Sequence, residues 1–183
     1  MNQIFFISIL ILLVSCSSVI KNKRVVGQEF PQSSGVSLFG EKHAISRASD
    51  SGFQILLIGY KQKTQFDIDR WLIGFEMTGV KVLINEIPVL NKWFPSFFRE
   101  KIDVGMKKGI PNGLWKAVIT VYDDAQVIKN FLGTENPNNA RVLLIGPNKK
   151  VLAQFDDGFS SSSLSHILSF LPSSKYERCK GLL

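Results

Sequence analysis

Short apolar runs with the length of buried β-strands recur along the chain. Residues 54–60 (QILLIGY) form the clearest one, and residues 80–87 and 117–122 form two more. Continuous apolar runs are typical of parallel strands that are covered on both faces. Two further runs, 141–146 and 150–155, flank a Pro-Asn-Lys turn and predict an antiparallel pair.

Helical periodicity fills the segments between these runs. A helix is predicted from about Phe66, with Asp67 as its N-cap, because apolar residues recur there at the spacing of one helical face. These residues are Ile68, Trp71, Leu72 and Phe75. Further helices are predicted over residues 96–108, over 125–132 and from the serine run to Pro172. The resulting order, βαβαβαββα, predicts an α/β fold in three layers (α/β/α), with helices on both faces of a mixed central sheet.

The N-terminal segment has the features of an export signal. Residues 4–14 are apolar apart from one serine, and this run is too short for a helical membrane span, which needs about 20 residues. It has the length of a signal-peptide core, although residues 1–3 carry no lysine or arginine. Residues 13–16 (LVSC) resemble a bacterial lipobox, which implies removal of residues 1–15 and acylation of Cys16, with palmitate-type chains. The alternative is an ordinary signal peptide, or a buried N-terminal helix, with an incidental cysteine.

This resemblance implies a place in the bacterial cell envelope. The lipoprotein modification supplies more than one acyl chain, which is sufficient for stable anchoring. Ser17 follows Cys16 where an aspartate would imply inner-membrane retention, so an outer-membrane anchor facing the periplasm is expected. The net charge is +7, but the basic residues are scattered, and no nucleic-acid partner is expected for an exported protein. The predicted partners are the membrane and an envelope protein.

Composition divides the remaining chain into three parts. Residues 16–34 are rich in serine, lysine and glutamine and are predicted to be a lipid-anchored tether, whose basic residues either contact anionic headgroups or are solvated. These basic residues are Lys21, Lys23 and Arg24. Residues 35–172 are predicted to form one domain, followed by a flexible C-terminal tail over 173–183.

The order of elements matches the thioredoxin fold, and two short segments resemble its redoxin and peroxiredoxin branch. Val26–Pro31 together with Ser37–Lys42 resembles the N-terminal β-hairpin extension of that branch, and Leu143–Val151 resembles its closing hairpin. The segment Met106–Val151 is also similar to the mitochondrial ATP synthase assembly factor family, at Met106–Pro111, at the end of the short helix (Phe131–Gly133) and at the closing hairpin. That second resemblance implies a role in assembling a membrane complex.

The thioredoxin resemblance also shows what the sequence lacks. In such enzymes the nucleophilic cysteine follows the first core strand, where the helix N-terminus lowers the pKa of the thiol. The corresponding loop contains no cysteine and reads Lys61, Gln62, Lys63, Thr64, Gln65, Phe66 and Asp67. The cis-proline that faces this loop in the family would fall near Arg141, and Pro137 lies four residues earlier. The resemblance therefore implies an inactive redox centre, and no cofactor is expected.

Other candidate chemistry is sparse. Cys179 lies in the polar tail close to basic residues that favour a thiolate, so the alternative function is a divergent thiol-disulfide oxidoreductase or peroxidase using Cys179. It is otherwise an incidental cysteine in a frayed C-terminus. The pairs Asp123-Asp124 and Asp156-Asp157 suit helix caps and turns better than a metal, and no metal site is predicted.

Four aromatic residues gather between a predicted strand and a predicted helix: Trp93, Phe94, Phe97 and Phe98. They cannot all face inward from the start of one helix, so they are either core residues or part of an exposed contact surface, for a partner or for the membrane interface. The sequence therefore predicts a membrane-anchored, redox-inactive thioredoxin-like domain that acts as a binding or assembly module.

Overall fold

The computed structural model describes residues 19–47, 52–91 and 93–176. The predicted lipidation site Cys16 and the candidate thiol Cys179 both lie outside the described residues. No helix within the described ranges is long and apolar enough to cross a membrane.

A mixed four-stranded sheet forms the centre of the domain. Its strands are β3 (Gln54–Gly59), β4 (Leu83–Pro88), β6 (Arg141–Ile145) and β7 (Val151–Phe155). Their order is β4-β3-β6-β7, with β3 parallel to β4 and antiparallel to β6, and with β6 and β7 forming an antiparallel pair. The predicted α/β class and mixed central sheet are confirmed.

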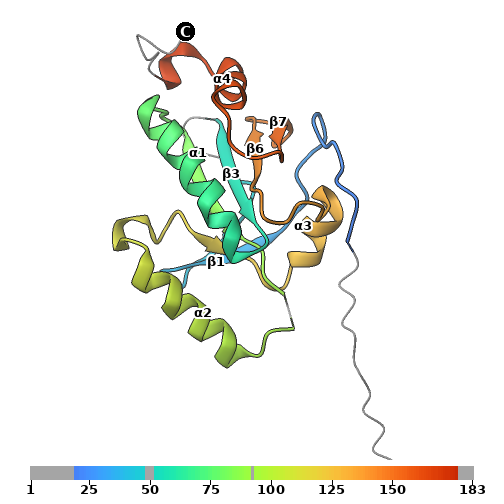
Figure 1. Ribbon diagram of the computed structural model, residues 1–183, viewed down its shortest axis with the longest axis vertical. Helices are drawn as coiled ribbons and strands as arrows, with labels where there is room; N and C mark the ends of the chain where they lie inside the picture. Colours follow the sequence, from blue (N-terminus) through green and yellow to red (C-terminus); the bar gives the residue numbers. More distant parts are fainter. Residues whose placement is uncertain (1–18, 48–51, 92, 177–183) are drawn as a thin grey trace, which may run out of the picture.

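Helices cover both faces of this sheet. α1 (Gln65–Met77) and α4 (Ser161–Ser169) pack on one face and α3 (Ala125–Leu132) packs on the other, whereas α2 (Ser96–Gly109) has no buried residue. Short 3-10 turns occur at η1 (Gln62–Thr64), η2 (Asn112–Leu114) and η3 (Ser173–Lys175). Ser160 caps α4, because its Oγ accepts a hydrogen bond from the N–H of Ser163. In Figure 1, α4 lies at one end of the long axis and α2 at the opposite end.

The alternation of β3 side chains explains why its sequence is apolar throughout. Ile55 and Leu57 pack in one core with α1 and α4, whereas Leu56 and Ile58 pack in a second core with α3. Every residue of β3 is therefore buried, as expected for a strand covered on both faces.

A smaller sheet lies beside the first. It contains β1 (Ser34–Ser37), β2 (Lys42–Ala44) and β5 (Ile119–Thr120), and parallel bridges join the β5 segment to the β4 segment. The hairpin β1–β2 occupies different residues from those predicted, because the turn falls at Gly40, which has a φ of +91°. Glu29, which was predicted to lie in that hairpin, instead bridges to Lys150.

The described part of the predicted tether is packed against the domain, which corrects the interpretation of residues 16–34. Val25 and Phe30 are buried in the core that contains α3. The N–H of Lys23 donates to the carbonyl of Leu132 at 3.1 Å. A Cβ at Gly133 would lie 2.4 Å from the Cα of Asn22, so glycine permits this close approach. Residues 16–34 are mostly polar, and the residues that Val25 and Phe30 contact lie far away in the sequence. The composition of the segment therefore did not predict this packing.

Further boundaries differ from the prediction, and the strand predicted over residues 117–122 is limited to β5, which lies in the smaller sheet. β4 begins at Leu83 rather than at residue 80, because Gly79 takes a φ of +55° after α1 and turns the chain. The predicted tail is ordered at its start, where the N–H of Lys81 donates to the carbonyl of Lys175 at 2.7 Å.

Candidate functional site

The loop that would carry the redox cysteine lies where β3 ends and α1 begins, and it contacts the segment before β6. Two hydrogen bonds make this contact, one from Thr64 and one to Asp67. The structure thus brings the predicted loop and the predicted cis-proline slot together.

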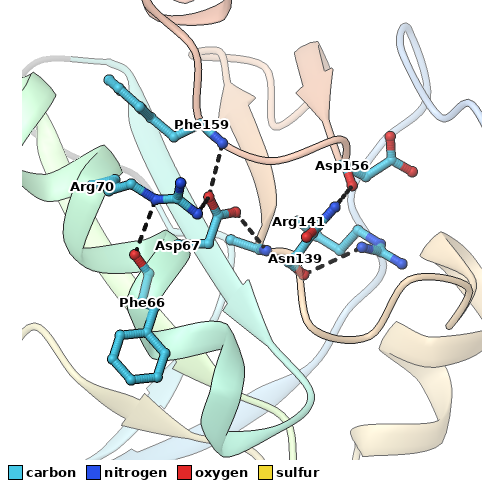
Figure 2. Close-up of polar contacts among 8 residues, drawn as sticks. Phe66, Asp67, Arg70, Asn139, Arg141, Asp156 and Phe159 are labelled. Atoms are coloured by element: carbon cyan, nitrogen blue, oxygen red, sulfur yellow. Dashed lines mark hydrogen bonds and ion pairs between the residues drawn. The ribbon is translucent and has the colours of Figure 1, made fainter.

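Asp67 is the best connected side chain of this loop. Its carboxylate is buried; Oδ2 accepts from the N–H of Ala140 at 2.9 Å and Oδ1 accepts from the N–H of Phe159 at 2.8 Å. Arg70 forms an ion pair with Oδ1 at 3.3 Å (Figure 2). The prediction that Asp67 caps α1 is wrong, because Thr64 is the N-cap and Asp67 lies in the first helical turn. Asp67 instead joins α1 to the segments before β6 and α4.

Thr64 makes the second connection. Its buried hydroxyl donates to the carbonyl of Pro137 at 2.9 Å and accepts from the N–H of Lys61 at 3.3 Å. Within the predicted redox loop, this hydroxyl therefore has both its donor and an acceptor role satisfied. Other loop side chains lie in solvent, including Lys61, Lys63 and Phe66, whose exposed fraction is 75%.

No cis peptide bond occurs in the described residues, and the predicted cis-proline slot is built differently. Ala140 uses its N–H to bind Asp67, which a proline could not do because it has no N–H. Arg141 follows as the first residue of β6 and is completely buried. The slot is therefore a hydrogen-bonded junction.

The Arg141 guanidinium holds the chain around this junction. Nη1 donates to the carbonyls of Asn136 and Asn139, both at 3.3 Å, and Nη2 donates to the carbonyl of Glu135. Nη2 also donates to Oδ1 of Asn22 at 3.0 Å, which ties in the N-terminal segment (Figure 2 shows the bond to Asn139). Arg141 thus serves as a structural cation among carbonyl groups.

Two titratable groups near the loop are strongly perturbed. Burial raises the pKa of Tyr60, against the opposing charge of Arg141, whose Cζ lies 5.6 Å from the centre of the Tyr60 ring. Burial raises the pKa of Glu86 to about 7; a hydrogen bond from Gln65 lowers it and the charge of Asp69 raises it. Glu86 could have been singled out from the sequence by one feature, a carboxyl group within a predicted, mostly apolar strand.

The aromatic segment before α2 lies at the surface. The exposed fractions are 79% for Trp93, 38% for Phe94, 54% for Phe97 and 46% for Phe98. No residue of α2 is buried. Core packing therefore does not account for these four side chains.

Polar contacts hold α2 against the domain. Arg99 forms an ion pair with Asp123 at 3.1 Å, and its Cζ lies 4.6 Å from the centre of the Tyr122 ring. The Tyr122 hydroxyl donates to Oδ1 of Asp103 at 3.3 Å, and burial raises the pKa of Asp103. The half-buried side of α2 thus combines these polar contacts with Ile102 and Met106, while its aromatic residues are exposed.

The other candidate residues have structural roles. Asp124 accepts from the N–H and the hydroxyl of Ser34, and Asp156 accepts from the side chain of Asn22 at 2.8 Å. Within residues 19–47, 52–91 and 93–176, no three His, Cys, Asp or Glu side chains gather as a metal site would require.

Solved structures similar to this chain share its fold at low sequence identity. A peroxiredoxin-like protein from Aquifex aeolicus has a TM-score of 0.54 and 13% identity, covering 84% of this chain and 92% of its own. A DsbF homologue from Corynebacterium diphtheriae has a TM-score of 0.53 and 13% identity, covering 86% and 96%. A SCO1/SenC family lipoprotein from Bacillus anthracis has a TM-score of 0.53 and 8% identity, covering 77% and 92%.

These similarities show that the domain has a thioredoxin-like fold. At such identities the likeness extends to the fold alone. No protein-family model matches the chain, and no curated protein matches it in sequence.

Proposed function

We propose that this protein is a membrane-anchored thioredoxin-like domain that acts without redox chemistry, as a binding or assembly module of the bacterial cell envelope. One observation carries the proposal. The start of α1, where redox members of the fold hold their cysteine, instead holds Thr64 and Asp67, and both are hydrogen-bonded to the segment before β6.

The chemistry of the junction supports this reading. A thiol-disulfide enzyme needs a thiolate that a substrate disulfide can reach. Thr64 supplies a hydroxyl that is buried and already bonded to Pro137, and the loop residues 60–67 contain no cysteine. The helix start thus stabilises the fold in the place where related enzymes carry out electron transfer.

The envelope location rests on the lipobox-like residues 13–16. Acylation at Cys16 would hold the domain at a membrane, and the proposed site is the outer membrane facing the periplasm. One protein of similar fold is itself described as a lipoprotein, which shows that this fold is compatible with such an anchor.

The contact surface of the proposed module is the exposed aromatic segment, Trp93, Phe94, Phe97 and Phe98. Exposed aromatic side chains beside basic residues are typical of sites that bind another surface. An assembly role agrees with the resemblance of Met106–Val151 to the ATP synthase assembly factor family.

A redox assay tests the proposal directly. The purified full chain should neither reduce insulin disulfides nor consume peroxide above a control without protein. Cys179→Ser should leave both readings at that same background level. Activity in the wild type that disappears in Cys179→Ser would replace the proposal with the enzyme that uses Cys179.

A further inference from the structure

The outer side of α2 combines apolar and cationic side chains in one stripe. Phe97, Lys101, Val104 and Lys108 recur at the spacing of one helical face. They line a shallow hollow together with Glu100 and Gly105. We call this stripe, with the neighbouring Trp93 and Phe98, the α2 surface. All of its aromatic residues are exposed.

Two lysines of α2 lie over aromatic rings. Lys101 lies 6.0 Å from the ring centre of Phe97, and Lys107 lies 5.3 Å from that of Trp115. The Trp115 ring meets Phe39 edge-on, with the centres 5.6 Å apart. Aromatic rings with lysines beside them are typical of helices that lie in a membrane interface, since the rings enter the headgroup layer while the ammonium groups reach phosphates.

The length of the chain between the proposed anchor and the domain adds an independent constraint. The N-terminal segment is fixed on the domain from Ile20, whose N–H donates to Oγ1 of Thr134 at 2.8 Å. The three residues from Cys16 to Val19 can span at most about 11 Å. An acylated Cys16 would therefore keep the domain close to the headgroup layer.

We propose that the α2 surface reaches this layer, and that it binds the anionic headgroups of the membrane to which the protein is anchored. Trp93 and Phe97 enter the interface, and Lys101 and Lys108 bind lipid phosphates. This inference rests on the proposed lipid anchor. It makes the bilayer itself the occupant of the aromatic surface and fixes the orientation of the domain.

A bilayer suits this surface better than a folded partner does. The hollow is shallow, and the apolar residues project from one convex helix, so the surface needs a partner that adapts its shape. Lipid headgroups adapt in this way, and their negative charge complements the lysines, which outnumber Glu100 on this side.

Quenching of tryptophan fluorescence by lipid tests the inference. The full chain is incorporated into phosphatidylcholine vesicles, with or without phosphatidylglycerol, whose acyl chains carry bromine. The variant Trp93→Phe identifies the emission of Trp93 among the three tryptophans. Trp93 should be quenched by brominated lipid, and more strongly when phosphatidylglycerol is present.

Matched charge variants assign the effect to the lysines. Lys101→Gln with Lys108→Gln should lower the ratio of docked to undocked domain by about thirtyfold, since one lysine near an anionic surface contributes about fivefold. Lys149→Gln with Lys150→Gln removes the same charge from the exposed β6–β7 turn and should leave the quenching unchanged. Equal melting midpoints would show that all variants fold.

The outcomes separate this inference from the proposed function. If the chain floats with vesicles, has the mass of an acylated protein and keeps an unquenched Trp93, the α2 surface does not bind lipid and a protein partner takes its place. If the chain is neither acylated nor vesicle-bound, the anchor is wrong and this inference fails with it. Redox inactivity is measured separately and is unaffected by either result.

Discussion

The helices α1 and α2 each follow a strand of the same sheet, but they use their side chains in opposite ways. Trp71 and Phe75 of α1 are buried in the core, whereas α2 has no buried residue. The start of α1 is fixed by hydrogen bonds from Thr64 and to Asp67, whereas the segment before α2 exposes Trp93. The helix that follows the predicted redox loop is thus built into the core, whereas α2 exposes the aromatic residues of the proposed contact surface.

The largest expected effect compares a tryptophan from each region. Trp71→Ala should lower the free energy of unfolding by about 3–5 kcal/mol, because it leaves a cavity in the core. Trp93→Ala should change it by less than about 0.5 kcal/mol, because the side chain is 79% exposed. Urea unfolding measures both values. A large loss for Trp93→Ala would show that the segment before α2 belongs to the core.

The next effect concerns the junction at the start of α1. Asp67→Ala should destabilise the domain by about 3 kcal/mol, because the buried N–H groups of Ala140 and Phe159 would lose their acceptor. Asp69→Ala, on the same helix but exposed, is the control and should cost less than about 1 kcal/mol. Similar unfolding curves for the two variants would contradict the structural role of Asp67.

A smaller effect should appear as a pH dependence of stability. The pKa of Glu86 is raised to about 7 in the folded domain, from an ordinary value of 4.5. Between these values the folded state binds more protons than the unfolded state, so this carboxyl group makes stability fall as pH rises from about 4.5 to 7. Its contribution to stability is fully present below this range and is lost above it.

Replacing the carboxyl group isolates this contribution. Glu86→Gln should flatten that part of the pH profile and should stabilise the domain relative to wild type above pH 7, by at most about 3 kcal/mol. Glu76→Gln, on the exposed side of α1, should leave the profile unchanged. Melting curves across this pH range measure both variants, and parallel profiles for wild type and Glu86→Gln would contradict the raised pKa.

The order of elements could be predicted because its signals are local. The apolar run of β3 and the helical spacing of Ile68, Trp71 and Phe75 depend only on neighbouring residues, and both elements occur where they were expected. Ser160 likewise caps its helix through a residue three positions away. Periodicity and capping are properties of short segments, which a sequence displays directly.

The candidate site depended on contacts that a sequence does not display. Asp67 resembles a helix cap, but its partners Ala140 and Phe159 lie more than seventy residues away. Val25 and Phe30 stand among polar residues, and their burial is visible only once β7 and α3 are in place. The location of the loop could therefore be predicted from the resemblance to the fold, whereas its hydrogen bonds to the segments before β6 and α4 could not.

Crosslinking in the intact cell envelope tests the contrast between the two helices most directly. A photoreactive phenylalanine analogue would replace Phe66 at the start of α1 in one variant and Phe97 on α2 in another, and both positions are exposed. We expect crosslinked products, with lipid as the main one, from position 97 and none from position 66. Products from position 66 alone would show that the domain binds through the start of α1, and would contradict the proposed role of the α2 surface.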